Sequence, residues 1–96
     1  MMDIRIEERT DAEILAELGR RLGKLRRSAG LTQAESAERA ALDRSTVSRA
    51  EQGDNPTLLT IVRLLRVYGR LVALDAFIPE PGVSPMALVR EARKRG

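Results

Sequence analysis

The stretch GLTQAESAERAALDRSTVSRAEQGDNP, residues 30–56, decides the fold of this chain. Thr32 and Glu35 match the capping box, in which each side chain bonds to the backbone N–H of the other residue, so a helix is expected to start there. Asp43 is a good N-cap residue, and a second helix is expected from it to about Gln52. Two short helices joined by a turn of roughly three or four residues form a helix-turn-helix unit.

Apolar residues recur at helical spacing on both sides of this unit. A second capping box, at Thr10 and Glu13, predicts a helix that ends at Gly30. The residues expected on its buried side are Ile14, Leu18, Leu22, Leu25 and Ala29. Thr57 is expected to cap a further helix, whose expected buried residues are Leu58, Ile61, Leu64, Leu65 and Tyr68.

The segments at the two ends have other patterns. Residues 1–9 alternate apolar and polar side chains and are expected to form an N-terminal tail or an edge strand. Residues 70–78 fit either a helix or a strand, and their Ala and Asp residues favour helix. Residues 79–96 are expected to form a Pro-containing linker and a short basic C-terminal helix with Ser84 as its N-cap. The sequence therefore predicts an all-α domain over residues 10–78, with its helix-turn-helix at 32–52 and a short C-terminal helical extension.

Composition excludes several classes of function. The 96 residues contain no His and no Cys, which removes disulfides, thiolate or imidazole zinc sites, and Ser–His or Cys–His nucleophile pairs. No apolar run approaches the roughly 20 residues needed to span a membrane. We therefore expect a cytoplasmic protein that is not an enzyme and has no catalytic residues, no metal, no cofactor and no membrane partner.

Charge is unevenly distributed along the chain. The formal net charge is +3, but the charged residues up to Gly19 are mostly acidic, and a basic group follows: Arg20, Arg21, Lys24, Arg26 and Arg27. Basic groups of this kind suit a polyanion, although helix faces that contact only solvent give the same pattern. Arg20, Lys24 and Arg27 form a stripe on the expected helix. Two interpretations of this stripe remain: contact with phosphate, or exposure to solvent alone.

The second helix of the unit has the side chains that recognition of double-stranded DNA requires. A recognition helix places small polar and basic side chains against base edges in the major groove, while its other face stays apolar and docked. Arg44, Ser45 and Arg49 meet the first demand, and Val47 meets the second. Gln33 begins the first helix, where backbone N–H groups attract a phosphate. The sequence therefore predicts double-stranded DNA as a partner.

These residues resemble the Xre family of Cro/lambda-repressor-type regulators. The resemblance runs from Leu18 to Leu58 and rests on Gly30-Leu31-Thr32-Gln33, on Arg44-Ser45-Thr46-Val47-Ser48-Arg49, and on Glu51, Gly53 and Asn55-Pro56. It implies a lambda-repressor-like domain of five helices. It also implies that Gln33 contacts backbone phosphate, that Arg44, Ser45 and Arg49 read bases, that Thr46 and Ser48 lie near phosphate or base edges, and that Asn55 lies in a loop near the backbone.

The chain departs from the family pattern at three positions. Ser36 stands where Leu is usual, and Ala50 stands where Ile or Leu is usual. Each smaller side chain would cost about 2–5 kcal/mol if nothing compensated for it. Ala41 replaces the usual turn Gly, at a cost of roughly 1 kcal/mol for a left-handed conformation. Stability is therefore expected from the C-terminal segment or from a dimer interface. Glu51 is expected to have a structural role, either paired with a cation or as a local helix cap.

Taken with the resemblance, these patterns predict a sequence-specific transcriptional regulator. We expect a repressor that binds operator half-sites as a homodimer, with the apolar residues of Leu71–Ile78 in its interface. The alternative is an antitoxin-type regulator, in which the segment Glu80–Gly96 also binds a toxin partner.

Overall fold

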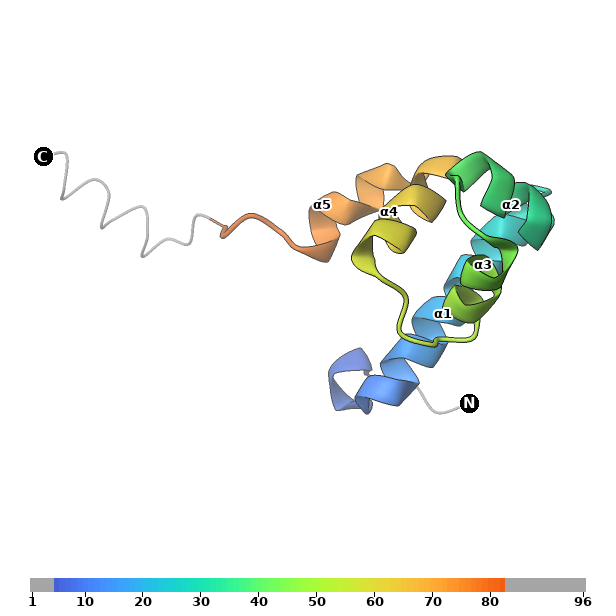
Figure 1. Ribbon diagram of the computed structural model, residues 1–96. Coiled ribbons are helices and arrows are strands. Elements are labelled where there is room, and N and C mark those ends of the chain that lie inside the picture. The colour runs from blue at the N-terminus through green and yellow to red at the C-terminus, as the bar shows by residue number, and fades with distance from the viewer. Residues whose placement is uncertain (1–4, 83–96) are drawn as a thin grey trace, which may run out of the picture.

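The computed structural model describes residues 5–82 of the chain, and within that range every regular element is a helix. A short 3-10 helix, η1 (Ile6–Glu8), precedes the long helix α1 (Asp11–Ser28). The helix-turn-helix pair, α2 (Gln33–Ala40) and α3 (Arg44–Glu51), comes next. The last elements are α4 (Leu58–Val67), the 3-10 helix η2 (Leu71–Ala73) and α5 (Leu74–Phe77). The all-α fold with five α-helices is confirmed (Figure 1).

Side-chain caps fix where the helices begin. The Thr10 hydroxyl accepts from the Glu13 backbone N–H at 3.2 Å, and the Glu13 carboxylate accepts from the Thr10 backbone N–H at 2.8 Å. The same reciprocal pair joins Thr32 and Glu35, at 3.1 and 2.9 Å. Asp43 holds the N-cap position of α3, but its side chain makes no capping hydrogen bond, contrary to expectation.

The two segments with open alternatives are helical where the structure describes them. Residues 71–77 form η2 and α5, so the strand alternative for residues 70–78 is wrong and the favoured helix is right. Ile6–Glu8 forms a 3-10 turn instead of an edge strand. The predicted C-terminal helix lies outside the described residues, and of the predicted toxin-binding segment only residues 80–82 are described.

The core lies where α1, α2, α3 and α4 meet. Helix α3 packs against α1, α2 and α4, and α2 also packs against α4. The buried apolar residues are Leu22, Leu31, Ala37, Ala40, Val47, Ala50, Leu64 and Tyr68. Leu18, Ala29 and Leu58 are exposed, which corrects the expectation that they are buried. Ala29 and Leu58 lie at helix ends, as the C-cap of α1 and the first residue of α4. Leu18 is 38 % exposed because it lines an open groove with Leu65 and Phe77.

The small residues at the family departures are compensated inside the domain. Ser36 is fully buried, and its hydroxyl accepts a hydrogen bond from the Tyr68 hydroxyl at 3.1 Å, so the tyrosine occupies the space beside it. Ala50 is 1 % exposed and faces Gly19 of α1, where an added Cβ would lie 2.7 Å from the Ala50 carbonyl oxygen. The two helices approach closely at this point because Gly19 has no side chain to meet the backbone at the C-terminal end of α3.

Ala41 has the left-handed conformation that the sequence predicted for it, with φ +55° and ψ +46° at the C-terminus of α2. The Arg63 guanidinium donates to the Ala41 carbonyl oxygen at 3.2 Å. This bond from α4 satisfies a carbonyl group that the end of α2 leaves without a helical partner. The turn between α2 and α3 is therefore held by a side chain of α4 as well as by its own backbone hydrogen bonds to α2.

Candidate nucleic-acid interface

Helix α3 presents a polar face and an apolar face, as a recognition helix must. Arg44, Ser45 and Arg49 are exposed, whereas Val47 and Ala50 are buried against the rest of the domain. Thr46 and Ser48 are half-buried, at the border between the two faces. The predicted base-reading side chains are thus free to meet a ligand, and the helix that carries them is held by its other side.

Gln52, the C-cap residue of α3, is a polar residue that the sequence analysis did not include in the site. Its side chain is exposed, and its Nε2 atom donates to the Ser48 hydroxyl at 3.3 Å. Residues four apart on a helix are neighbours, so the spacing from Ser48 to Gln52 was a signal that could have placed Gln52 beside the predicted site.

A hydrogen-bonded ion pair joins α1 to the end of α3. The Arg26 guanidinium donates twice to the Glu51 carboxylate, with Nε to Oε2 at 2.6 Å and Nη2 to Oε1 at 3.1 Å. A third donor, Nη1, bonds to the Leu31 carbonyl oxygen at 2.9 Å. The two side chains are only 12 % and 10 % exposed, and the hydrogen bonding to Glu51 raises the pKa of Arg26. The expected pairing of Glu51 with a cation is confirmed.

Gln33 is attached to the same carboxylate. Its Nε2 atom donates to Glu51 Oε1 at 3.1 Å, across 18 positions of sequence. We refer to Arg26, Glu51 and Gln33 as the triad. The structure thus links the residue predicted for a phosphate contact, at the start of α2, to the last residue of the predicted recognition helix.

Asn55 lies in the loop between α3 and α4, as predicted, and its side chain is exposed. Its φ is +39°, and Gly53 two residues before it has φ +77°. Asn tolerates the left-handed region better than most residues, because its short polar side chain bonds locally. The predicted site residues therefore lie on α2, on α3 and in the loop that follows α3.

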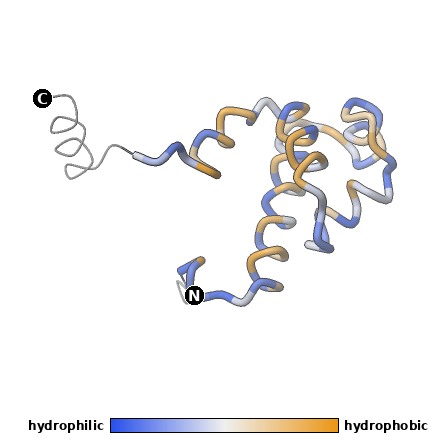
Figure 2. The backbone as a smooth tube through the Cα atoms, turned by 60° about the vertical axis from the view of Figure 1, so that its left-hand side comes forward, coloured by the Kyte–Doolittle hydropathy of each residue, from blue (hydrophilic) through white to orange (hydrophobic). Residues whose placement is uncertain are grey.

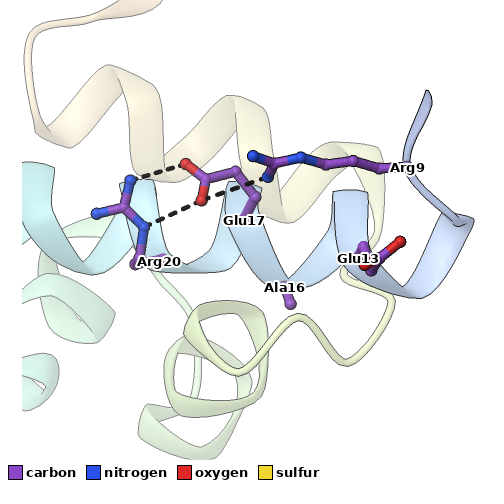
Figure 3. Close-up of a pocket in the computed structure, with 5 residues that line it drawn as sticks. All are labelled: Arg9, Glu13, Ala16, Glu17 and Arg20. Carbon is purple, nitrogen blue, oxygen red and sulfur yellow. Dashed lines mark hydrogen bonds and ion pairs between the residues drawn. The ribbon is translucent and has the colours of Figure 1, made fainter. Parts of the chain in front are cut away.

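The basic stripe of α1 is partly neutralised. Glu17 accepts from Arg20 at 2.7 and 3.1 Å, and Arg9 lies 3.7 Å from the same carboxylate (Figure 3). Glu17 also accepts from Arg21 at 2.9 Å. These hydrogen bonds lower the pKa of Glu17 to about 2, so its negative charge persists at any ordinary pH. Arg20 is thereby less available to phosphate, whereas Lys24 and Arg27 are exposed.

Within residues 5–82, no helix is long and apolar enough to cross a membrane. The same range contains no group of three or more acidic side chains placed to hold a metal ion.

Comparison with known proteins places the chain in a family. A family model described as a helix-turn-helix domain matches residues 17–77, a range that includes α2, α3 and all the predicted site residues. The chain is 39 % identical over 64 residues to the HTH-type transcriptional regulator PuuR of Escherichia coli (strain K12) and to the protein of the same name from Shigella flexneri. The match covers 66 % of this chain and 34 % of each relative, so the chain spans about a third of their length. The Xre-type resemblance is thus confirmed, and the chain belongs to the helix-turn-helix domain family.

Proposed function

We propose that this protein is a DNA-binding transcriptional regulator that recognises a specific operator sequence through α3. The main support is that α3 has an exposed polar face and a buried apolar face. Arg44, Ser45 and Arg49 are exposed, whereas Val47 and Ala50 are buried. A rigidly docked helix with an exposed basic and polar face fits the major groove, where Arg pairs with guanine and Ser with several bases. In this proposal residues 10–78 form the DNA-binding domain, and the protein acts in the cytoplasm.

The proposed contacts divide into two kinds. Arg44, Ser45 and Arg49 read base edges, and Thr46 and Ser48 lie near bases or phosphate. Gln33 and Asn55 contact the backbone and set the register of α3 in the groove, because contacts to phosphate position a protein without reading sequence. The names of the PuuR relatives, which describe HTH-type transcriptional regulators, support the assignment.

Arg49→Ala tests the base-reading claim. Operators are selected by the wild-type protein from a random pool of duplexes, and affinities are then measured for the selected duplex and for an unselected one. We expect the variant to lose about 1–3 kcal/mol on the selected duplex and to accept more sequences. Arg66→Ala, which removes the same charge from an exposed position on α4, is the matched control and should lose much less. Equal losses in the two variants would mean that α3 is not the reading helix.

We further propose that the regulator acts as a homodimer and represses transcription. Apolar side chains are exposed on η2 and α5, with Val72 76 %, Ile78 70 % and Phe77 54 % exposed. Beside them is a groove of about 420 Å³ between α1, α4 and α5, with Leu18, Leu65 and Phe77 among its lining residues. Figure 2 colours stretches of both α1 and the η2–α5 segment as hydrophobic. We propose that a second copy covers this surface, and binding of the dimer to two half-sites requires recognition helices about 34–36 Å apart, or a multiple of that.

Sedimentation tests the dimer with charge substitutions on the proposed interface. Val72→Glu and Ile78→Glu should each give a monomer at tens of micromolar, while the wild-type protein sediments as a dimer. Ile6→Glu is the matched control, since Ile6 is also an exposed apolar residue but lies on η1, before α1. A wild-type monomer, with or without DNA, would refute the dimer. Repression is measured with a reporter gene that carries the selected operator.

A further inference from the structure

We propose that Glu51 is a positioning residue for DNA binding, because it orients the Gln33 amide for its contact with the phosphate backbone. The inference rests on the proposed function, in which Gln33 makes that contact. It assigns a role in binding to a side chain that itself lies at the α1–α3 junction and is only 10 % exposed. The observation behind it is the 3.1 Å hydrogen bond from Gln33 Nε2 to Glu51 Oε1.

The chemistry of the two groups fixes the amide orientation. An ionised carboxylate only accepts hydrogen bonds, so the Gln33 side chain must turn its NH₂ group, and not its carbonyl oxygen, toward Glu51. An NH₂ group has two hydrogens. One is used on Glu51, and the other is left to donate to a phosphate oxygen at the start of α2. The terminal torsion of a free glutamine is broad, so a Gln33 without this partner would have to be ordered when DNA binds.

Arg26 makes this arrangement compatible with a polyanion. An unpaired carboxylate close to DNA would repel the phosphates. The Arg26 guanidinium donates to both oxygens of Glu51 and offsets its charge. Arg26 is held in turn by the Leu31 carbonyl, one residue before the N-cap of α2. The triad therefore has no net charge, and it ties α1 and α3 to the start of α2.

A double-mutant cycle separates this role from simple bracing of the fold. The background variant is Arg26→Met with Glu51→Met, which replaces the ion pair with apolar side chains of similar length and leaves the net charge of the protein unchanged. Such replacements of buried ion pairs often preserve the fold, and thermal melting followed by circular dichroism checks that. Gln33→Ala is then measured in both backgrounds, on the operator selected by the wild-type protein and on an unselected duplex.

In the wild-type background we expect Gln33→Ala to weaken binding about fivefold on both duplexes, since one hydrogen bond to a phosphate is lost irrespective of sequence. The salt dependence should not change, because a neutral amide displaces no counterion. In the background without the ion pair the same substitution should change affinity by less than about twofold, since the amide is no longer oriented. An equal fold-change in the two backgrounds would overturn the proposal. The proposal would also be overturned if Gln33→Ala had no effect on affinity in either background. In that case, weaker operator binding by Arg49→Ala would show that the proposed function of α3 still stands.

A second measurement needs no variant. The ¹⁵N relaxation of the Gln33 side-chain amide in the free wild-type protein should give an order parameter near that of rigid backbone, about 0.85. The exposed side-chain amide of Asn55 provides the comparison within the same molecule. A Gln33 value below about 0.6 would mean that Glu51 does not order the amide, and the proposal would be wrong.

Discussion

Replacing Gly19 with alanine tests how closely α1 and α3 approach. A Cβ atom at this position would lie 2.6 Å from the Glu51 carbonyl oxygen, 2.7 Å from the Ala50 carbonyl oxygen and 2.8 Å from the Gly53 nitrogen. All three are backbone atoms, so they cannot rotate away as the end of a side chain could. The helices must move apart, and the interior around Ala50 loses contacts that depend steeply on distance.

The size of the effect follows from two opposing contributions. Overpacking of this kind costs about 1–3 kcal/mol, and three backbone contacts place Gly19→Ala at the upper end of that range. Alanine is favoured over glycine in a helix by roughly 1 kcal/mol, and this preference offsets part of the destabilisation caused by overpacking. We therefore expect a net loss of about 2 kcal/mol, or a fall in Tm of roughly 8–16 °C for a domain of this size.

Gly23→Ala is the matched control, since Gly23 is also buried and lies one turn later on α1. A Cβ there would lie 3.1 Å from Glu51 Oε1 and 3.2 Å from Arg27 Nη1, which are side-chain atoms and not backbone. The exposed Arg27 side chain can move away, and the hydrogen-bonded Glu51 carboxylate has to shift by only a few tenths of an ångström. The helix-forming gain should then keep this variant within about 1 kcal/mol of the wild type.

Urea denaturation followed by circular dichroism gives the free energy of unfolding for both variants. The reasoning would be refuted by a Gly19→Ala protein as stable as the wild type. It would equally be refuted by Gly23→Ala costing as much as Gly19→Ala, because the difference between backbone and side-chain obstruction would then not matter.

Three further substitutions test other features of the fold. Ala41→Gly should raise the free energy of unfolding by up to about 1 kcal/mol in a urea titration, because glycine takes φ +55° without steric cost; a loss would mean that the turn is not strained. Tyr68→Phe should lower it by about 1–3 kcal/mol, since the fully buried Ser36 hydroxyl loses its donor, and adding Ser36→Ala should recover part of that loss in the double variant. The pKa of Glu17 is lowered to about 2 from its ordinary 4.5, so its stabilising effect is complete above pH 4.5 and is lost as the pH falls toward 2. Wild type should therefore melt above Glu17→Gln at pH 7, and the two melting temperatures should converge near pH 2, whereas a gap that does not change with pH would contradict the ion-pair explanation.

Sequence patterns predicted the helices well where the interactions are local. Both capping boxes were identified because their partners are three residues apart, and the structure contains both. The two faces of α3 were predicted for the same reason, since side chains three or four apart share one side of a helix. The pattern was less informative for burial, because periodicity shows which side of a helix is apolar but not whether a neighbouring helix covers each position, and Leu18 and Leu58 are exposed.

The sequence by itself determined the element order, the helix-turn-helix and the side chains exposed on α3, because these depend on hydrogen bonds and periodicity within a few residues. Only the tertiary structure decided which distant groups meet. Arg26 bonds to Glu51 across 25 positions and Tyr68 bonds to Ser36 across 32, and neither pairing leaves a periodic signal in the chain. The stretch from Gly30 to Pro56 therefore specifies a recognition helix, while the packing of α1 against α3 brings Arg26 to Glu51 and so decides how Glu51 and the Gln33 side chain are held.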